Sequence, residues 1–140
     1  MTIKFSRLQE YLDLIVSNAG DNINTSPHKR FWATHQSLTA QPLPAPKCQN
    51  ADIFAVKYLD AAHTGVDADN SPLFIILTNA NGFCGKVQMP PLGPFITDQG
   101  FQLTLSDGTV VTGDQIKNDI HDWLAAGAPD DQPNTPLSPV

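Results

Sequence analysis

The sequence predicts a mainly helical fold with one β-hairpin inserted ahead of the last helix, and a mixed α+β fold is the alternative. Apolar residues recur at helical spacing over residues 6–19 and again over 112–126. A further apolar segment begins at Ser71-Pro72, where serine suits a helix cap and proline suits the first helical position. Residues 101–112 alternate around an Asp-Gly turn, which is typical of a hairpin.

The first predicted helix covers residues 6–19. Ser6 suits the N-cap, and Gln9 follows three residues later, as in a capping box. Gly20 can adopt the left-handed conformation that ends a helix. The buried face is expected to consist of the residues that recur at helical spacing: Leu8, Tyr11, Leu12, Ile15 and Val16.

A second, short helix is predicted to start at Pro27, with four ring-bearing side chains on one face: His28, Phe31, Trp32 and His35. These residues indicate either a ligand or metal site built from the two histidines, or an aromatic plug against the first helix. The two histidines are seven residues apart, roughly 10 Å along a helix axis. That separation is too large for both to bind one metal on a straight helix.

Three strands are predicted from alternating residues. Residues 53–59 place Phe54, Val56 and Tyr58 on one face of a short strand. Residues 101–105 and 109–112 form the two arms of the hairpin, joined by a two-residue turn at Asp107-Gly108.

The last predicted helix follows this hairpin directly. Thr112 suits its N-cap, with Gln115 three residues on. Gly127 ends the helix and Pro129 prevents its return. One buried stripe is expected at i, i+4, i+7 and i+8, formed by Ile116, Ile120, Trp123 and Leu124.

The 140 residues fit a single globular domain over 1–129, followed by a disordered tail over 130–140 that is polar, acidic and rich in proline. Net charge is −6 and the basic residues are scattered, so nucleic acid and anionic membrane are poor candidate partners. No apolar run approaches the roughly 20 residues that span a bilayer. No signal peptide is visible at the start of the chain.

Cys48 and Cys84 are the two cysteines, and both lie in segments rich in proline or glycine. A disulfide between them would close a loop of about 37 residues and add roughly 3–4 kcal/mol by chain entropy. The other interpretation is a pair of free thiols in a reducing compartment.

Three blocks in order resemble the second half of class I cytochrome c-like domains of a bacterial type, over about 60 of the 140 residues. They are a helix start at Asn70-Ser71-Pro72-Leu73, a Met-Pro-Pro turn at 89–94, and a final Trp-Leu-Ala-Ala-Gly-Ala-Pro at 123–129. The resemblance implies that the first and last helices, residues 6–19 and 114–126, cross. It also implies that Met89 would be the sixth ligand of a haem.

Two features depart from that family. The Cys-x-x-Cys-His motif for covalent haem is absent, and the 101–112 hairpin is inserted between turn and helix. One hypothesis is a haem-free domain in which side chains fill the haem space, namely Phe31, Trp32, Phe54, Phe83 and Phe95. The other is non-covalent haem held between Met89 and His28 or His35.

The leading functional hypothesis is therefore a non-enzymatic accessory subunit without cofactor or metal, partnering a larger protein such as a redox enzyme. The first rival is an electron carrier that binds haem or copper through Met89 and one histidine. The second is a small thiol-dependent enzyme using Cys84, since no other catalytic motif is present. Export to the periplasm is expected if the resemblance and the disulfide hold, and a cytoplasmic location otherwise.

Overall fold

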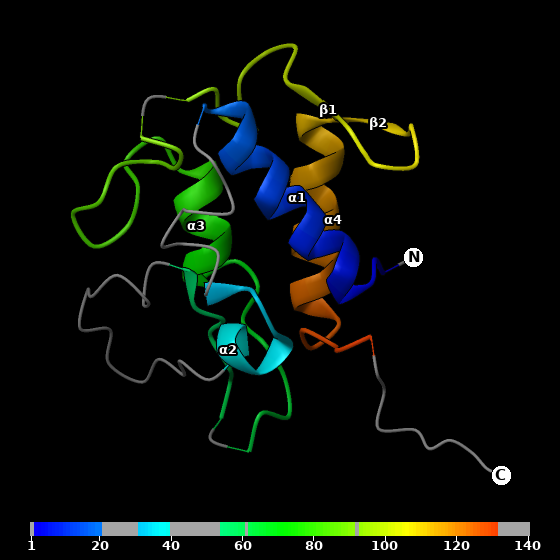
Figure 1. Ribbon diagram of the computed structural model, residues 1–140. Coiled ribbons are helices and arrows are strands. Elements are labelled where there is room, and N and C mark those ends of the chain that lie inside the picture. The colour runs from blue at the N-terminus through cyan, green and yellow to red at the C-terminus, as the bar shows by residue number, and fades with distance from the viewer. Residues whose placement is uncertain (1, 21–30, 40–53, 61, 92, 132–140) are drawn as a thin grey trace, which may run out of the picture.

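The computed structural model describes residues 2–20, 31–39, 54–60, 62–91 and 93–131. Within these residues the fold is mixed, with helices predominating over one small antiparallel sheet, as predicted. None of the described helices is both long and apolar enough to cross a membrane. The elements in chain order are α1 Phe5–Asn18, α2 His35–Thr39, α3 Pro72–Thr78, β1 Gln102–Thr104, β2 Val110–Thr112 and α4 Gly113–Ala125 (Figure 1).

Helices α1 and α4 lie across one another (Figure 1), and their side chains are in contact. Near the middle of both helices, the Tyr11 hydroxyl donates a 2.6 Å hydrogen bond to Asp119 Oδ2. Towards one end, the ring centroids of Phe5 and Trp123 lie 6.1 Å apart. The predicted stripe on α4 is confirmed, because Ile116, Ile120, Trp123 and Leu124 are all buried.

Helix α3 completes the hydrophobic core. It begins at Pro72, as predicted, and the backbone N–H of Leu73 donates to the carbonyl of Ala55, which ties the preceding extended segment to the helix. Its buried face meets α4 and joins the cluster that α1 also enters. The fully buried members from these three helices include Leu8, Leu12, Leu73, Ile76, Ile116 and Ile120.

The start of α1 differs from the prediction. The helix begins at Phe5, one residue early, and Ser6 is not its cap. Instead, the backbone N–H of Ser6 donates to Asp131 Oδ2 at 3.0 Å, so a carboxylate from the far end of the chain supplies the missing acceptor. The predicted capping box is also wrong, because the Gln9 side chain donates to the carbonyl of Trp32.

The second helix also starts later than predicted. Helix α2 covers His35–Thr39, while Phe31 lies in a separate 3₁₀ turn, and His28 is outside the described residues. A reciprocal pair sets the start: Thr34 Oγ1 accepts from the backbone N–H of Ser37, and Ser37 Oγ accepts from that of Thr34. This pair resembles a capping box, with serine in the place of glutamate.

No strand forms over the described part of 53–59. Residues 58 and 66 make an isolated antiparallel bridge, and Asp67 N–H donates to the Lys57 carbonyl. The predicted alternation also fails, because Phe54, Ala55 and Val56 are all buried. Among the described residues, the extended segment is hydrogen-bonded to its own return loop and to the start of α3, and no sheet ladder forms.

The hairpin is confirmed, with β1 and β2 antiparallel and Leu103 opposite Val111. Its connection has three residues rather than the predicted two. Leu105 N–H donates to the Thr109 carbonyl, and Gly108 N–H donates to the Leu105 carbonyl. Gly108 has φ of +89°, as the left-handed position of a three-residue loop requires.

Helix α4 begins where the sequence predicts. Thr112 Oγ1 accepts from the backbone N–H of Gln115 at 3.1 Å, which confirms the cap. Gly113 is buried, and a Cβ there would lie 1.9 Å from the carbonyl oxygen of Ile96. Only glycine therefore lets the start of α4 pass so close to the backbone of Ile96.

Candidate functional site

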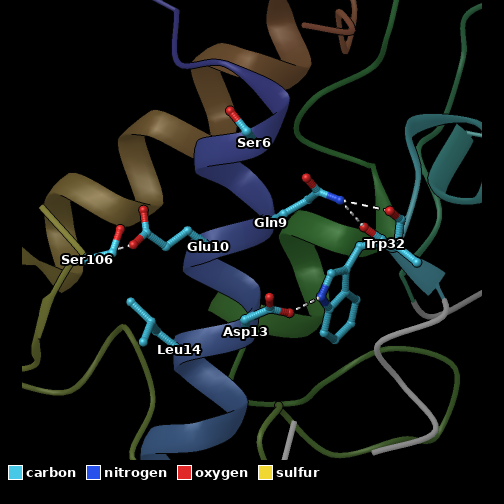
Figure 2. A pocket seen from close by; sticks show the side chains of 8 residues that line it. Ser6, Gln9, Glu10, Asp13, Leu14, Trp32 and Ser106 are labelled. Atoms are coloured by element: carbon cyan, nitrogen blue, oxygen red, sulfur yellow. Dashed lines mark hydrogen bonds between the residues drawn. The ribbon is translucent and has the colours of Figure 1, made fainter. Parts of the chain in front are cut away.

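A hollow of the described structure runs along the polar face of α1, beside the hairpin loop. It has a volume of about 570 Å³ and is open to solvent along one side. Figure 2 shows its walls, which come from α1, from the turn before α2 and from the hairpin. We call it the α1 cleft, and its polar lining consists of Ser6, Gln9, Glu10, Asp13, Trp32 and Ser106.

Two polar side chains of the α1 cleft are bonded to the turn before α2. Asp13 Oδ1 accepts a 2.8 Å hydrogen bond from the indole N–H of Trp32. Gln9 Nε2 donates to the carbonyls of Trp32 and Ala33, each at 2.9 Å (Figure 2). Because the Trp32 ring is buried, the Asp13 bond satisfies an indole donor that would otherwise be unpaired. These side chains therefore fasten the turn to α1.

Glu10 ties the same helix to the hairpin. Its Oε2 accepts from the backbone N–H of Ser106 at 2.7 Å, and its Oε1 lies 3.9 Å from Arg7 Nε. Arg7 also donates to Asp107 in the hairpin loop at 3.4 Å. The pKa of Asp107 is held below its usual range first by hydrogen bonding from Thr109, with the Arg7 charge a smaller cause. The pairs on this surface are exposed and each is worth little.

The carboxylates of the α1 cleft take part in hydrogen bonds within the protein. General acid–base catalysis needs carboxylates or imidazoles that can reach a substrate proton. Here the carboxylates of Glu10 and Asp13 accept hydrogen bonds from the protein itself. No group of three or more His, Cys, Asp or Glu side chains gathers as a metal site anywhere in the described part of the chain.

Met89 lies beside a second, apolar hollow, which measures only about 30 Å³. We call it the Met89 hollow, and its walls include Leu12, Ile15, Val16, Trp32, Phe54 and Leu77. The Met89 side chain is half-buried, and its backbone N–H donates to the carbonyl of Ile76 at 2.8 Å. Pockets for drug-sized ligands occupy about 300–1,000 Å³, so the described side chains leave no space of that size here.

His35 lies at the opposite end of α1 from Met89. Its Nε2 bonds the carbonyl of Ala128 at 2.6 Å, and its ring packs edge-on against Phe5 at 5.4 Å. Met89 instead shares its hollow with Val16, eleven residues further along α1, which corresponds to about 16 Å of helix. The structure therefore does not bring Met89 and His35 together. His28 lies outside the described residues.

Three of the five aromatic residues proposed to fill the haem space form one cluster. The Phe31 and Phe54 rings stack at 5.8 Å, and Trp32 meets Phe54 edge-on at 5.3 Å. Phe83 packs against the same core while remaining partly exposed. Phe95 is half-buried and is not part of that core cluster.

The structure describes one of the two cysteines, Cys84. Cys84 is not free, and it has φ of +53° at the tip of a tight turn between Phe83 and Lys86. Cys48 lies outside the described residues, so its pairing with Cys84 stays a prediction.

Two polar contacts of α4 were not predicted. His121 Nε2 lies 2.8 Å from Asp69 Oδ1, and the His121 ring packs edge-on against Phe74. The second contact is the hydrogen bond that Asp119 accepts from the Tyr11 hydroxyl of α1. Burial is the main cause that raises the pKa of Tyr11 well above its usual range, and this hydrogen bond is the next cause. Asp119 and His121 both lie off the apolar stripe of their helix, and that position was the available signal in the sequence. Their partners come from distant segments, which helical spacing does not reveal.

No protein-family model, curated protein or solved structure matches this chain.

Proposed function

We propose that this chain is a non-enzymatic interaction subunit that binds a larger protein. The observation that carries this proposal is the internal use of the α1 cleft. Its carboxylates and its amide side chain bond the turn before α2 and the hairpin loop, so they maintain the fold rather than meet a substrate. The small size of the Met89 hollow supports the haem-free form of the proposal.

The resemblance of three sequence blocks to cytochrome c-like domains supports a more specific partner, a redox enzyme. In this proposal the domain keeps a helical scaffold suited to docking and leaves the electron transfer to its partner. The chain carries a net charge of −6, which favours a partner with a basic surface.

Exposed apolar side chains are the places to test for docking. The large ones in the described structure are Leu59, Val87 and Val110, which are 66%, 56% and 53% exposed. Val110 lies directly opposite Thr104 in the hairpin, and both side chains are exposed. Exposed apolar residues that stand singly are common on proteins, so each must be changed in turn.

The test is co-purification of a tagged chain from its native host, followed by gel filtration and native mass spectrometry. We expect a stoichiometric complex, and at least one of Leu59→Lys, Val87→Lys and Val110→Lys should reduce its recovery. Thr104→Lys is the matched control for Val110, because it adds the same charge on the opposite strand. A chain that elutes alone under all conditions would contradict the proposal.

The electron carrier is the alternative, and an absorption spectrum separates it from the interaction subunit. Protein produced with haem or copper present should stay colourless if the leading proposal holds. A Soret band that disappears in Met89→Ala would favour the carrier instead. For the thiol-enzyme alternative, Cys84 would have to be released from its present bonding before it could act as a nucleophile.

A further inference from the structure

We propose that Met89 is an oxidation site at which a peroxide loosens the packing of α1 against the aromatic cluster of Trp32 and Phe54. This inference does not depend on the proposed function. It rests on where the thioether lies and on what surrounds it.

The Met89 side chain is accessible on one side and enclosed by apolar groups on the other. It is half-buried, and the exposed ring of Pro91 is part of the same rim. Behind it lie Trp32 and Phe54, which are 1% and 4% exposed. An oxidant that reaches the sulfur from the exposed side of Met89 would therefore produce a polar group beside the core.

The reaction balances with a peroxide as the named oxidant. The sulfur lone pair attacks one peroxide oxygen, a sulfur–oxygen bond forms and the oxygen–oxygen bond breaks. The sulfur loses two electrons, and water leaves when the oxidant is hydrogen peroxide. The product, methionine sulfoxide, is polar where the thioether was apolar, and dedicated reductases can reverse the change.

The described residues of the Met89 hollow offer no free side-chain donor for the new oxygen. Among its lining residues, Trp32 alone carries a side-chain N–H, and that group already donates to Asp13. The hollow of about 30 Å³ is also too apolar to hold a water with several polar partners. The sulfoxide must therefore leave the hollow or remain unpaired in it, and either outcome weakens the contact between α1 and the aromatic cluster.

The test treats the full chain with hydrogen peroxide and locates the added oxygen by peptide mass mapping. Met1 is the only other methionine and serves as an internal control. We expect oxidation at Met89, and an equilibrium constant for unfolding that rises about tenfold to a hundredfold in denaturant titrations. A methionine sulfoxide reductase should restore the original titration curve.

Two variants make the test specific. Met89→Leu conserves volume and should fold, and it should show no shift after peroxide treatment. Met89→Gln places a polar group in the hollow and should show the shift without peroxide. The proposal is overturned if Met89 stays unoxidised when Met1 is oxidised, if its sulfoxide leaves the titration unchanged, or if Met89→Leu shifts as much as the wild type.

Discussion

Tyr11 and Asp119 illustrate how one pair of side chains can hold two long helices together. The hydroxyl of Tyr11 is buried at the contact between α1 and α4, and its donor reaches a carboxylate at 2.6 Å. Hydrogen bonds to charged groups are among the stronger ones in proteins. The pair therefore fixes the position at which the helices meet, while the surrounding apolar residues supply most of the burial.

Tyr11→Phe is expected to lower the free energy of unfolding by about 1–3 kcal/mol, because Asp119 loses its donor. Chemical denaturation of the wild type and the variant measures the loss. A double-mutant cycle with Asp119→Ala isolates the pair, and its coupling energy should be at least about 0.5 kcal/mol. Strict additivity of the two changes would show that the hydrogen bond does not stabilise the fold.

The same pair gives a pH dependence with a definite sign. Burial and Asp119 raise the pKa of Tyr11 above its usual value of about 10, so the folded state retains a proton that the unfolded state loses. The stabilisation is complete below about pH 10 and is lost as pH rises further. Tyr58, whose pKa burial also raises, acts in the same direction.

We therefore expect the free energy of unfolding of the wild type to fall between about pH 10 and pH 12. The fall should be shallower in Tyr11→Phe and shallowest when Tyr58 is also replaced by Phe. Denaturant titrations at pH 8, 10 and 11 check this series, because these values lie below, at and above the usual tyrosine pKa of about 10. Equal slopes in all three proteins would contradict it.

Among the elements, the start of α4 could be predicted from the sequence and the start of α1 could not. The start of α4 was predicted because Thr112 caps it from within three residues. The start of α1 was not predicted, because the Ser6 N–H in its first turn donates to Asp131, at the other end of the fold. A capping pattern at Ser6 and Gln9 was present, but the Gln9 side chain bonds the turn before α2 instead.

This difference gives a direct prediction about α1. Asp131→Ala removes the acceptor of the Ser6 N–H and should cost about 0.5–2 kcal/mol of folding stability. Ser6→Ala should change stability by less than about 0.5 kcal/mol, because its exposed side chain is not the cap. Thermal or denaturant unfolding of the two variants checks the order. The reverse order would mean that Ser6 caps the helix in solution.

One physical reason explains why the hairpin prediction was confirmed and the prediction of a strand over residues 53–59 was wrong. Residues 101–112 contain both strands and their turn, so the pairing is local and periodicity was sufficient. Residues 54–59 alternate as well, but their partners are a loop and a helix start rather than another strand. Alternation shows that a segment can be extended, and only the tertiary fold determines whether a ladder forms.

At the scale of the whole molecule, the candidate site was the least predictable part. The sequence indicated Met89 and the aromatic residues, and the structure places Met89, Trp32 and Phe54 around one hollow. The sequence could not show that His35 lies at the end of α1 far from Met89. The α1 cleft was also missed, because its walls come from three segments with no shared motif.

The predicted disulfide between Cys48 and Cys84 would affect the stability of the whole chain. If Cys48 and Cys84 are bonded, the unreduced protein unfolded in denaturant should not react with a thiol-alkylating reagent. Cys84→Ser should then lower the free energy of unfolding by about 3–4 kcal/mol, because opening the closed loop of about 37 residues gives the unfolded chain more conformational freedom. Two alkylated thiols in the unreduced wild type would exclude the bond, and with it the argument for an oxidising compartment.

The bond between Asp131 and Ser6 also brings the two ends of the described structure next to each other. A short peptide linker could therefore join the regions around these residues with little distortion, and new termini could be opened at the exposed hairpin loop around Asp107. Such a circularly permuted chain would keep every core helix uninterrupted.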